Sequence, residues 1–125
     1  MHTSPGTPIS QQCFTDKIDD ETLGPWIDVR GKMNVVFYLT SDGTTSSGVI
    51  SIEEAAPKDL AANPVVFGAA TGSYSLITTK NASDFTGDAQ VAIHLDSDRA
   101  YCFVRARIST VIGGGGSVSA GCVAY

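Results

Sequence analysis

The sequence predicts an all-β domain: an antiparallel β-sandwich of jelly-roll type, with about eight strands and an extended N-terminal arm. Apolar residues recur with a period of two in short runs, as they do in half-buried strands. Turn-forming residues separate these runs at short spacing, and no segment shows helical periodicity beyond one turn. The length of 125 residues suits one domain. Eight short strands favour the jelly roll over the seven-stranded immunoglobulin type.

The chain is predicted to divide between residues 25 and 26. Residues 1–25 form an N-terminal arm and lead-in segment, because the first twelve are rich in Pro, Ser and Thr. Residues 26–125 form the β-sandwich domain. The arm carries four clustered acids without the ligand spacing or glycine of a calcium loop, so we expect them on a solvated surface. They are Asp16, Asp19, Asp20 and Glu21.

Strand patterns recur from residue 26 onward and give seven to eight strands. The segments that carry them are 26–29, 33–40, 49–54, 73–79, 89–95, 101–110 and 117–125. Asp42-Gly43 predicts a turn after the second segment, since glycine readily adopts a positive φ. Residues 55–72 include two prolines and are predicted to form a connecting loop with room for one helical turn. Residues 81–88 and 113–116 are predicted turns.

Alternation within the last three segments predicts which side chains face the core. The three inward rows are Ala89, Val91, Ile93 and Leu95; Cys102, Val104, Ala106 and Ile108; and Val118, Ala120, Cys122 and Ala124. The opposite face of the segment 101–110 differs sharply in chemistry, because aromatic rings and arginines occupy it.

The three cysteines are predicted to be free thiols. Their number is odd and no two of them form a Cys-x-x-Cys pair, which argues against a disulfide framework or a zinc site. A hairpin at 113–116 would offset Cys102 and Cys122 along their strands by more than the ~7 Å that a disulfide tolerates between Cα atoms. A cross-link from Cys13 to a neighbouring molecule stays open.

Charge and hydropathy exclude several classes of partner. The net charge of −5 argues against nucleic-acid binding, which needs a basic surface. No stretch approaches the ~20 apolar residues of a membrane helix, and the N-terminus lacks the apolar run of a signal peptide. We therefore expect a soluble product made in the cytoplasm. Charged residues make up 17% of the chain, below the ~25% of ordinary domains. This leaves two alternatives: a surface that is easily desolvated against a neighbour, or the ordinary Thr- and Ser-rich surface of a β-protein.

No motif in the sequence predicts catalysis, a cofactor or a metal site. The glycine run 113–116 lacks the Lys-Ser/Thr of a phosphate-binding loop and precedes a strand. His94 lies near Asp96 and Asp98, yet no nucleophile motif accompanies it. We therefore expect a protein that is not an enzyme and works by binding other proteins.

The aromatic and arginine row is the candidate interface. It consists of Tyr101, Phe103, Arg105 and Arg107, with Arg99 just before it. Aromatic residues and arginine are enriched at interface hot spots. Residues 99–125 also contain no acid, so these arginines could meet acids of the next subunit in a cyclic ring. The alternative is that the chain's own N-terminal segment or a loop covers this face.

Three segments resemble small virion proteins of tailed bacteriophages, and the resemblance extends over about residues 26–125. The segments are Gly48-Val-Ile-Ser-Ile-Glu-Glu-Ala55, Ala92-Ile-His-Leu95 and Tyr101-Cys-Phe-Val-Arg-Ala-Arg-Ile-Ser-Thr110. The resemblance implies a capsid decoration (cement) protein, commonly a homotrimer, that binds the major capsid protein. Its location would be the virion, after synthesis in the host bacterial cytoplasm.

The same resemblance leaves one alternative, because similar sandwiches occur in tail fibres and baseplates. There the protein would bind a receptor or a carbohydrate through exposed aromatic side chains. The candidates for such a site are Trp26, Tyr38, Tyr74 and Tyr101. Aromatics exposed in a groove would favour this function, and aromatics packed between subunits would favour the structural one.

Overall fold

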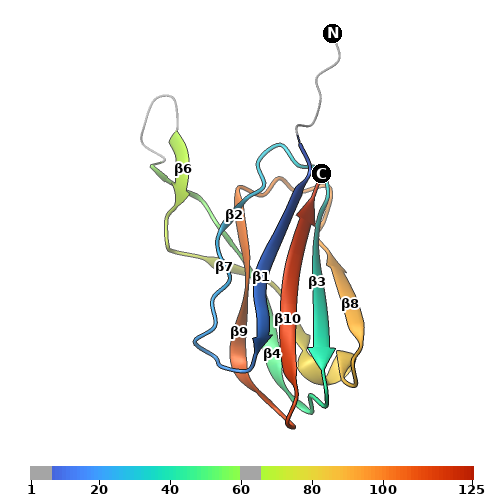
Figure 1. Ribbon diagram of the computed structural model, residues 1–125. Coiled ribbons are helices and arrows are strands. Elements are labelled where there is room, and N and C mark those ends of the chain that lie inside the picture. The colour runs from blue at the N-terminus through green and yellow to red at the C-terminus, as the bar shows by residue number, and fades with distance from the viewer. Residues whose placement is uncertain (1–6, 60–65) are drawn as a thin grey trace.

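A computed structural model of the chain describes residues 7–59 and 66–125, and these form two four-stranded sheets and a small hairpin (Figure 1). The strands are β1 (Ile9–Lys17), β2 (Ile27–Asp28), β3 (Val35–Asp42), β4 (Ser47–Ala55), β5 (Pro57–Asp59), β6 (Val66–Ala70), β7 (Ser75–Asn81), β8 (Gln90–His94), β9 (Phe103–Gly113) and β10 (Ser117–Ala124). One short 3₁₀ helix, η1, spans Ala82–Phe85. No helix in these two ranges is long and apolar enough to cross a membrane.

The predicted antiparallel β-sandwich is confirmed. One sheet has the strand order β1-β10-β3-β8 and the other β2-β9-β4-β7. The first four strands pair with the last four in nested order: β1 with β10, β2 with β9, β3 with β8 and β4 with β7. This nested pairing brings together segments that lie far apart along the chain.

The core fills the space between the two sheets. Phe37 and Leu39 of β3 face Ile50 and Ile52 of β4, and all four are fully buried. Most of the predicted inward rows are confirmed, including the row of β8, which packs against the core in part-buried positions. Cys102 differs, because it is only half-buried. Gly43 has a φ of +77°, as its predicted turn requires.

The N-terminal segment differs from the predicted arm. Ile9–Lys17 forms the edge strand β1, with Ile9 opposite Ala124 of β10. Its exposed Ser, Gln and Thr positions obscured the strand pattern, since Phe14 is its one fully buried side chain. Among the described residues, the sandwich therefore includes part of the segment 1–25. Residues 1–6 lie outside the described residues.

The segment between β1 and β2 continues along the edge of the other sheet. The Gly24 N–H donates to the Ala106 carbonyl at 2.8 Å, and the Ile108 N–H donates to the Thr22 carbonyl at 3.1 Å. A Cβ atom at residue 24 would lie 2.5 Å from the Ala106 carbonyl oxygen. Only glycine therefore lets this segment approach β9 so closely.

The long connection 55–72 also differs from prediction. It contains the hairpin β5–β6, and no helical turn lies in its described part. A helical turn lies instead in the predicted turn 81–88, where Ala82 and Phe85 of η1 insert into the core. Two buried side chains three residues apart suit a 3₁₀ turn, because this spacing puts them on one face.

Candidate functional site

A buried carboxylate joins two arginines on the outer face of the β2-β9-β4-β7 sheet. Glu53 of β4 is 1% exposed and accepts from Arg105 Nε at 2.9 Å and from Arg107 Nε at 2.7 Å. Each arginine takes one oxygen of the same carboxylate. A buried charge is tolerated only when it is fully paired, so this geometry makes the two arginines obligatory partners of Glu53.

Two aromatic rings complete the group. The Arg105 guanidinium carbon lies 4.3 Å from the Trp26 ring centre and 5.0 Å from that of Tyr74. The Arg107 guanidinium carbon lies 5.4 Å from the Tyr74 ring centre. Guanidinium groups are attracted to ring faces at these distances. We call Trp26, Glu53, Tyr74, Arg105 and Arg107 the arginine cluster.

The register of β4 against β9 explains why the residues of the cluster lie together. Glu53 lies directly opposite Arg105 in the antiparallel pair of β4 and β9, and Arg107 lies opposite Ser51 on the same face. Trp26 comes from the segment just before β2, and Tyr74 from the segment just before β7. Four distant parts of the chain thus meet at one face of one sheet.

The cluster carries a net positive charge of one, since two guanidinium groups face one carboxylate. The hydrogen bond to Glu53 holds the pKa of Arg107 above its ordinary value. Among the described residues, the Nη atoms of Arg105 have no acceptor, and Arg107 Nη2 has only the Tyr74 hydroxyl at 3.5 Å. The Nε sides of both arginines are used internally, so the Nη sides remain for a ligand with a negative charge.

Exposed apolar side chains border the cluster on the same face. Leu23 lies opposite Arg107 in an isolated bridge, and Leu76 of β7 lies opposite Glu53. Leu23 is 56% exposed, Leu76 58% and Tyr74 49%. Paired positions on adjacent strands point to the same side of a sheet. The fixed arginines are therefore surrounded by apolar surface open to solvent.

Arg99 belongs to a separate and more exposed contact. Its Nη2 donates to Glu54 Oε1 at 2.7 Å, and its guanidinium carbon lies 4.9 Å from the Tyr101 ring centre. The hydrogen bond to Glu54 raises the pKa of Arg99. Beside it lies a cleft of about 480 Å³, lined by Glu54, Ala55, Ala56, Thr71, Ser73, Tyr74, Ser75, Ala100 and Cys102.

Arg105 and Arg107 lie on one face of β9 as predicted, whereas the prediction that Tyr101 and Phe103 are exposed beside them is wrong. The role of this row as an interface stays a prediction. Tyr101 and Phe103 are only 6% and 5% exposed. Phe103 lies opposite Asp28 of β2, so part of the N-terminal segment lies at the edge of β9. Tyr101 instead precedes β9 and packs in the core cluster. The alternative predicted from sequence, coverage by the chain's own N-terminal segment, fits Arg105, whose guanidinium group lies over the Trp26 ring.

The remaining sequence candidates lie apart from the cluster. His94 is exposed on β8. The three cysteines are free, as predicted. Burial raises the pKa of Cys13 to about 11 and that of Cys122 to about 12. Within residues 7–59 and 66–125, no group of three His, Cys, Asp or Glu residues is placed to hold a metal ion.

The comparisons with known proteins identify no relative of this chain. No family model matches it, and neither the curated proteins nor the solved structures contain a match. The class of protein is therefore defined by the fold and the site alone: a β-sandwich that presents a fixed arginine and aromatic group within an exposed apolar rim.

Proposed function

We propose that the protein is a structural, non-enzymatic protein that binds other proteins through the arginine cluster and its apolar rim. The observation that carries this proposal is the Glu53 carboxylate, which fixes Arg105 and Arg107 beside exposed Leu23 and Leu76. Arginine and aromatic residues at the centre of an apolar patch are the usual composition of a binding hot spot.

Fixing the arginines in advance favours binding. A free arginine loses rotamer freedom when a partner immobilises it, which costs about 0.5–1.5 kcal/mol for each such side chain. The side chain of Arg105 is 11% exposed and that of Arg107 is 24% exposed, and both are already held by Glu53 and the rings. The partner would therefore supply a carboxylate to the Nη atoms and apolar contacts to the rim.

The resemblance of the sequence to tailed-phage virion proteins suggests which partner this is. We propose a capsid decoration protein, located in the virion, whose partner is the major capsid protein. A protein that binds only the mature shell stabilises it by mass action and needs no catalysis. The resemblance implies a homotrimer, a state that rests on the resemblance alone, and the mass of the protein in solution distinguishes it from a dimer.

A tail fibre or baseplate module is the second candidate, and the cleft beside Tyr74 favours it. Hydroxyl groups of Thr71, Ser73 and Ser75 line this cleft together with the Glu54 carboxylate. An aromatic ring next to several hydroxyl and carboxylate groups is a suitable setting for a carbohydrate, which presents both apolar and hydroxyl faces. In this case the ligand would be a receptor glycan rather than the shell.

The test is quantitative mass spectrometry of purified virions of the phage that encodes the chain. We expect a copy number comparable to that of the major capsid protein. Only a few copies per particle would transfer the protein to the tail and favour the second candidate. Complete absence from particles would overturn the virion assignment.

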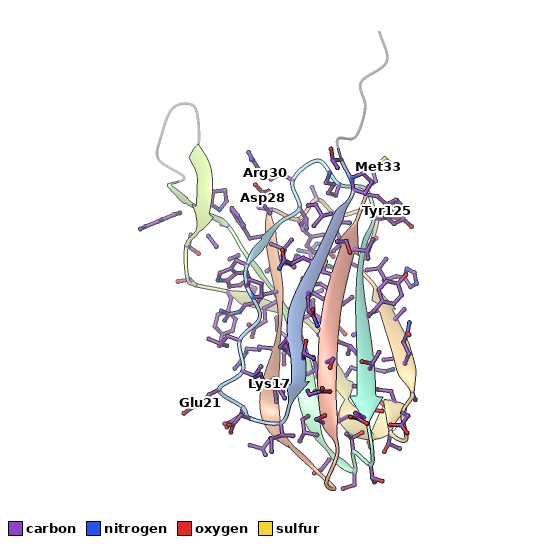
Figure 2. The ribbon with its side chains drawn as sticks, in the orientation of Figure 1. Lys17, Glu21, Asp28, Arg30, Met33 and Tyr125 are labelled. Carbon is purple, nitrogen blue, oxygen red and sulfur yellow. The ribbon has the colours of Figure 1, made fainter. Side chains whose placement is uncertain are left out.

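A matched pair of variants tests the surface itself. Leu76→Glu places a charge in the apolar rim, and we expect it to abolish binding to particles that lack the protein. Met33→Glu is the control, because Met33 is 70% exposed and lies at the end of the sandwich near Tyr125 (Figure 2). Equal binding of the two variants would show that the arginine cluster is not the binding surface.

A further inference from the structure

In the described part of the chain, β8 is the one of the four edges of the two large sheets that nothing in its own sequence protects. We propose that β8 pairs antiparallel with β8 of a second copy about a twofold axis, so that two four-stranded sheets become one continuous sheet. This inference does not depend on the proposed function, because the edge lies in the β1-β10-β3-β8 sheet and the arginine cluster in the other.

The other three edges of the two large sheets carry features that hinder strand addition. The register of β1 shifts twice, and its Asp16 has a φ of +50°. β7 has an irregularity opposite the step from Ile52 to Glu53, and it contains Lys80. β2 has two residues and follows Pro25. Each of these edges is therefore interrupted, very short or charged.

β8 has none of these features. Its sequence Gln-Val-Ala-Ile-His contains no Lys, Arg, Asp, Glu, Pro or Gly, and its pairing with β3 runs without a register shift. It lies at the outer edge of its sheet, away from the β5–β6 hairpin (Figure 1). A regular and uncharged edge is a template for another strand.

The alternation of the backbone shows which groups are free. The Leu95 N–H donates to the Val35 carbonyl of β3, and the Ala89 carbonyl accepts from the Ser41 N–H. Odd-numbered residues of β8 therefore direct their N–H and carbonyl groups toward β3. Gln90, Ala92 and His94 direct theirs toward the free edge. An antiparallel partner strand would engage all three N–H and all three carbonyl groups.

The strand is complementary to itself in one register. A twofold axis through Ala92 puts Ala92 opposite its copy, which is a hydrogen-bonded pair because both backbones face the shared edge. Val91 then lies opposite Ile93 of the second copy on the core side, and Gln90 lies opposite His94 on the outer side. The part-buried row of β8 thus continues from one copy into the next.

Two acids limit the strength of this pairing. In the same register Asp88 of one copy approaches Asp96 of the other at each end of the paired segment. Each carboxylate already accepts a backbone N–H: Asp88 from Gly43 at 2.8 Å and Asp96 from Asp98 at 2.9 Å. The repulsion between them is screened by salt. Dimerisation should therefore strengthen as salt is added, whereas binding of an acidic partner at the arginine cluster should weaken.

The test is the mass of the full-length protein by sedimentation equilibrium over a range of concentrations. We expect a monomer–dimer equilibrium whose dimer has twice the 13.0 kDa of the chain, and whose dissociation constant falls at higher salt. Ala92→Lys puts two like charges face to face at the axis and should leave only monomer. Thr79→Lys on the edge strand β7 is the matched control and should dimerise like the wild type.

A cross-linking variant gives a positive readout. Hydrogen-bonded antiparallel residues have Cα atoms about 5.5 Å apart, within the range of a disulfide, so Ala92→Cys should form a covalent dimer under mild oxidation. Thr79→Cys should not. A protein that stays monomeric up to millimolar concentration, or an oligomer that Ala92→Lys leaves unchanged, would overturn the inference. Absence of the protein from virions would leave it standing, because that result concerns only the proposed function.

Discussion

The outer faces of the two sheets of this sandwich differ in the side chains that they carry. The β2-β9-β4-β7 sheet places a buried carboxylate and two arginines on its outer face. The β1-β10-β3-β8 sheet instead presents a shallow groove of about 300 Å³, lined by uncharged residues such as Ser10, Tyr38, Ser119 and Gly121. The outer face of the first sheet thus carries an ion-paired group, whereas the groove on the second is lined by uncharged residues.

The arginines near the C-terminus pair with acids of the same fold, which changes what a partner could engage. The sequence suggested that the arginines near the C-terminus meet acids of another subunit. Their Nε groups instead meet Glu53 of the neighbouring strand, and Arg99 meets Glu54. The charge imbalance along the chain is thus partly balanced within the fold. A partner would engage only the groups that remain, which are the Nη atoms and the apolar rim.

Removing the buried carboxylate tests this comparison most strongly. Glu53→Gln leaves Arg105 and Arg107 without an anionic partner, and loss of one member of a buried ion pair destabilises by about 3–5 kcal/mol. We expect a loss of this size in the free energy of unfolding, measured by urea denaturation. The control is Glu54→Gln, whose partner Arg99 is exposed, and it should leave the midpoint unchanged. Equal losses for the two variants would contradict the comparison.

Replacing Glu53, Arg105 and Arg107 together by apolar residues sharpens the comparison between the two sheets. Buried ion pairs exchanged for well-packed apolar side chains are often neutral or stabilising, by about 1–4 kcal/mol. The triple variant Glu53→Met, Arg105→Leu, Arg107→Leu should therefore be at least as stable as the wild type in urea, and it should not bind particles. A triple variant as unstable as Glu53→Gln would mean that the arginines stabilise the fold through contacts beyond the carboxylate.

High pH tests the β1-β10-β3-β8 sheet, because Cys13 lies in β1 and Cys122 in β10. Burial raises their pKa values from 9.0 to about 11 and about 12, so the native state keeps protons that the unfolded chain loses. Stability from these thiols is complete below pH 9.0 and falls as the pH rises through the native values. The urea midpoint should therefore fall above pH 9.0 less steeply in a Cys13→Ser, Cys122→Ala variant than in the wild type. Parallel slopes would show that the two thiols are accessible in the native state.

The alternation of the sequence predicted which face each side chain occupies, and much less about what covers that face. It placed Arg105 and Arg107 on one side of their strand, and the structure agrees. It also placed Tyr101 and Phe103 there, and these two are buried. Alternation holds only within a strand, and Tyr101 precedes β9 and packs in the core. The exposure of Phe103 depends also on the segment beside it, which comes from the N-terminal part of the chain.

For Glu53, the sequence predicted the face of the sheet but not the partners of the side chain. The alternation of residues 49–54 predicted that Glu53 points to the opposite face of the sheet from Ile52. Its partners were not predictable, because Arg105 lies 52 residues away and only the register of β4 against β9 brings them together. β1 was missed for a related reason: an edge strand with one fully buried side chain carries too little apolar periodicity to be distinguished from a polar arm.

The nested pairing of the strands also orders events during synthesis. Ile9 lies opposite Ala124, so β1 has no neighbour until β10 has left the ribosome. β2 similarly depends on β9, and β3 on β8 and β10. The sandwich therefore cannot form progressively from its N-terminus, and native structure must arise late, in a step dominated by long-range closure. β1 and β2 would wait longest, because their partners β10 and β9 are made after all the other strands of the two sheets.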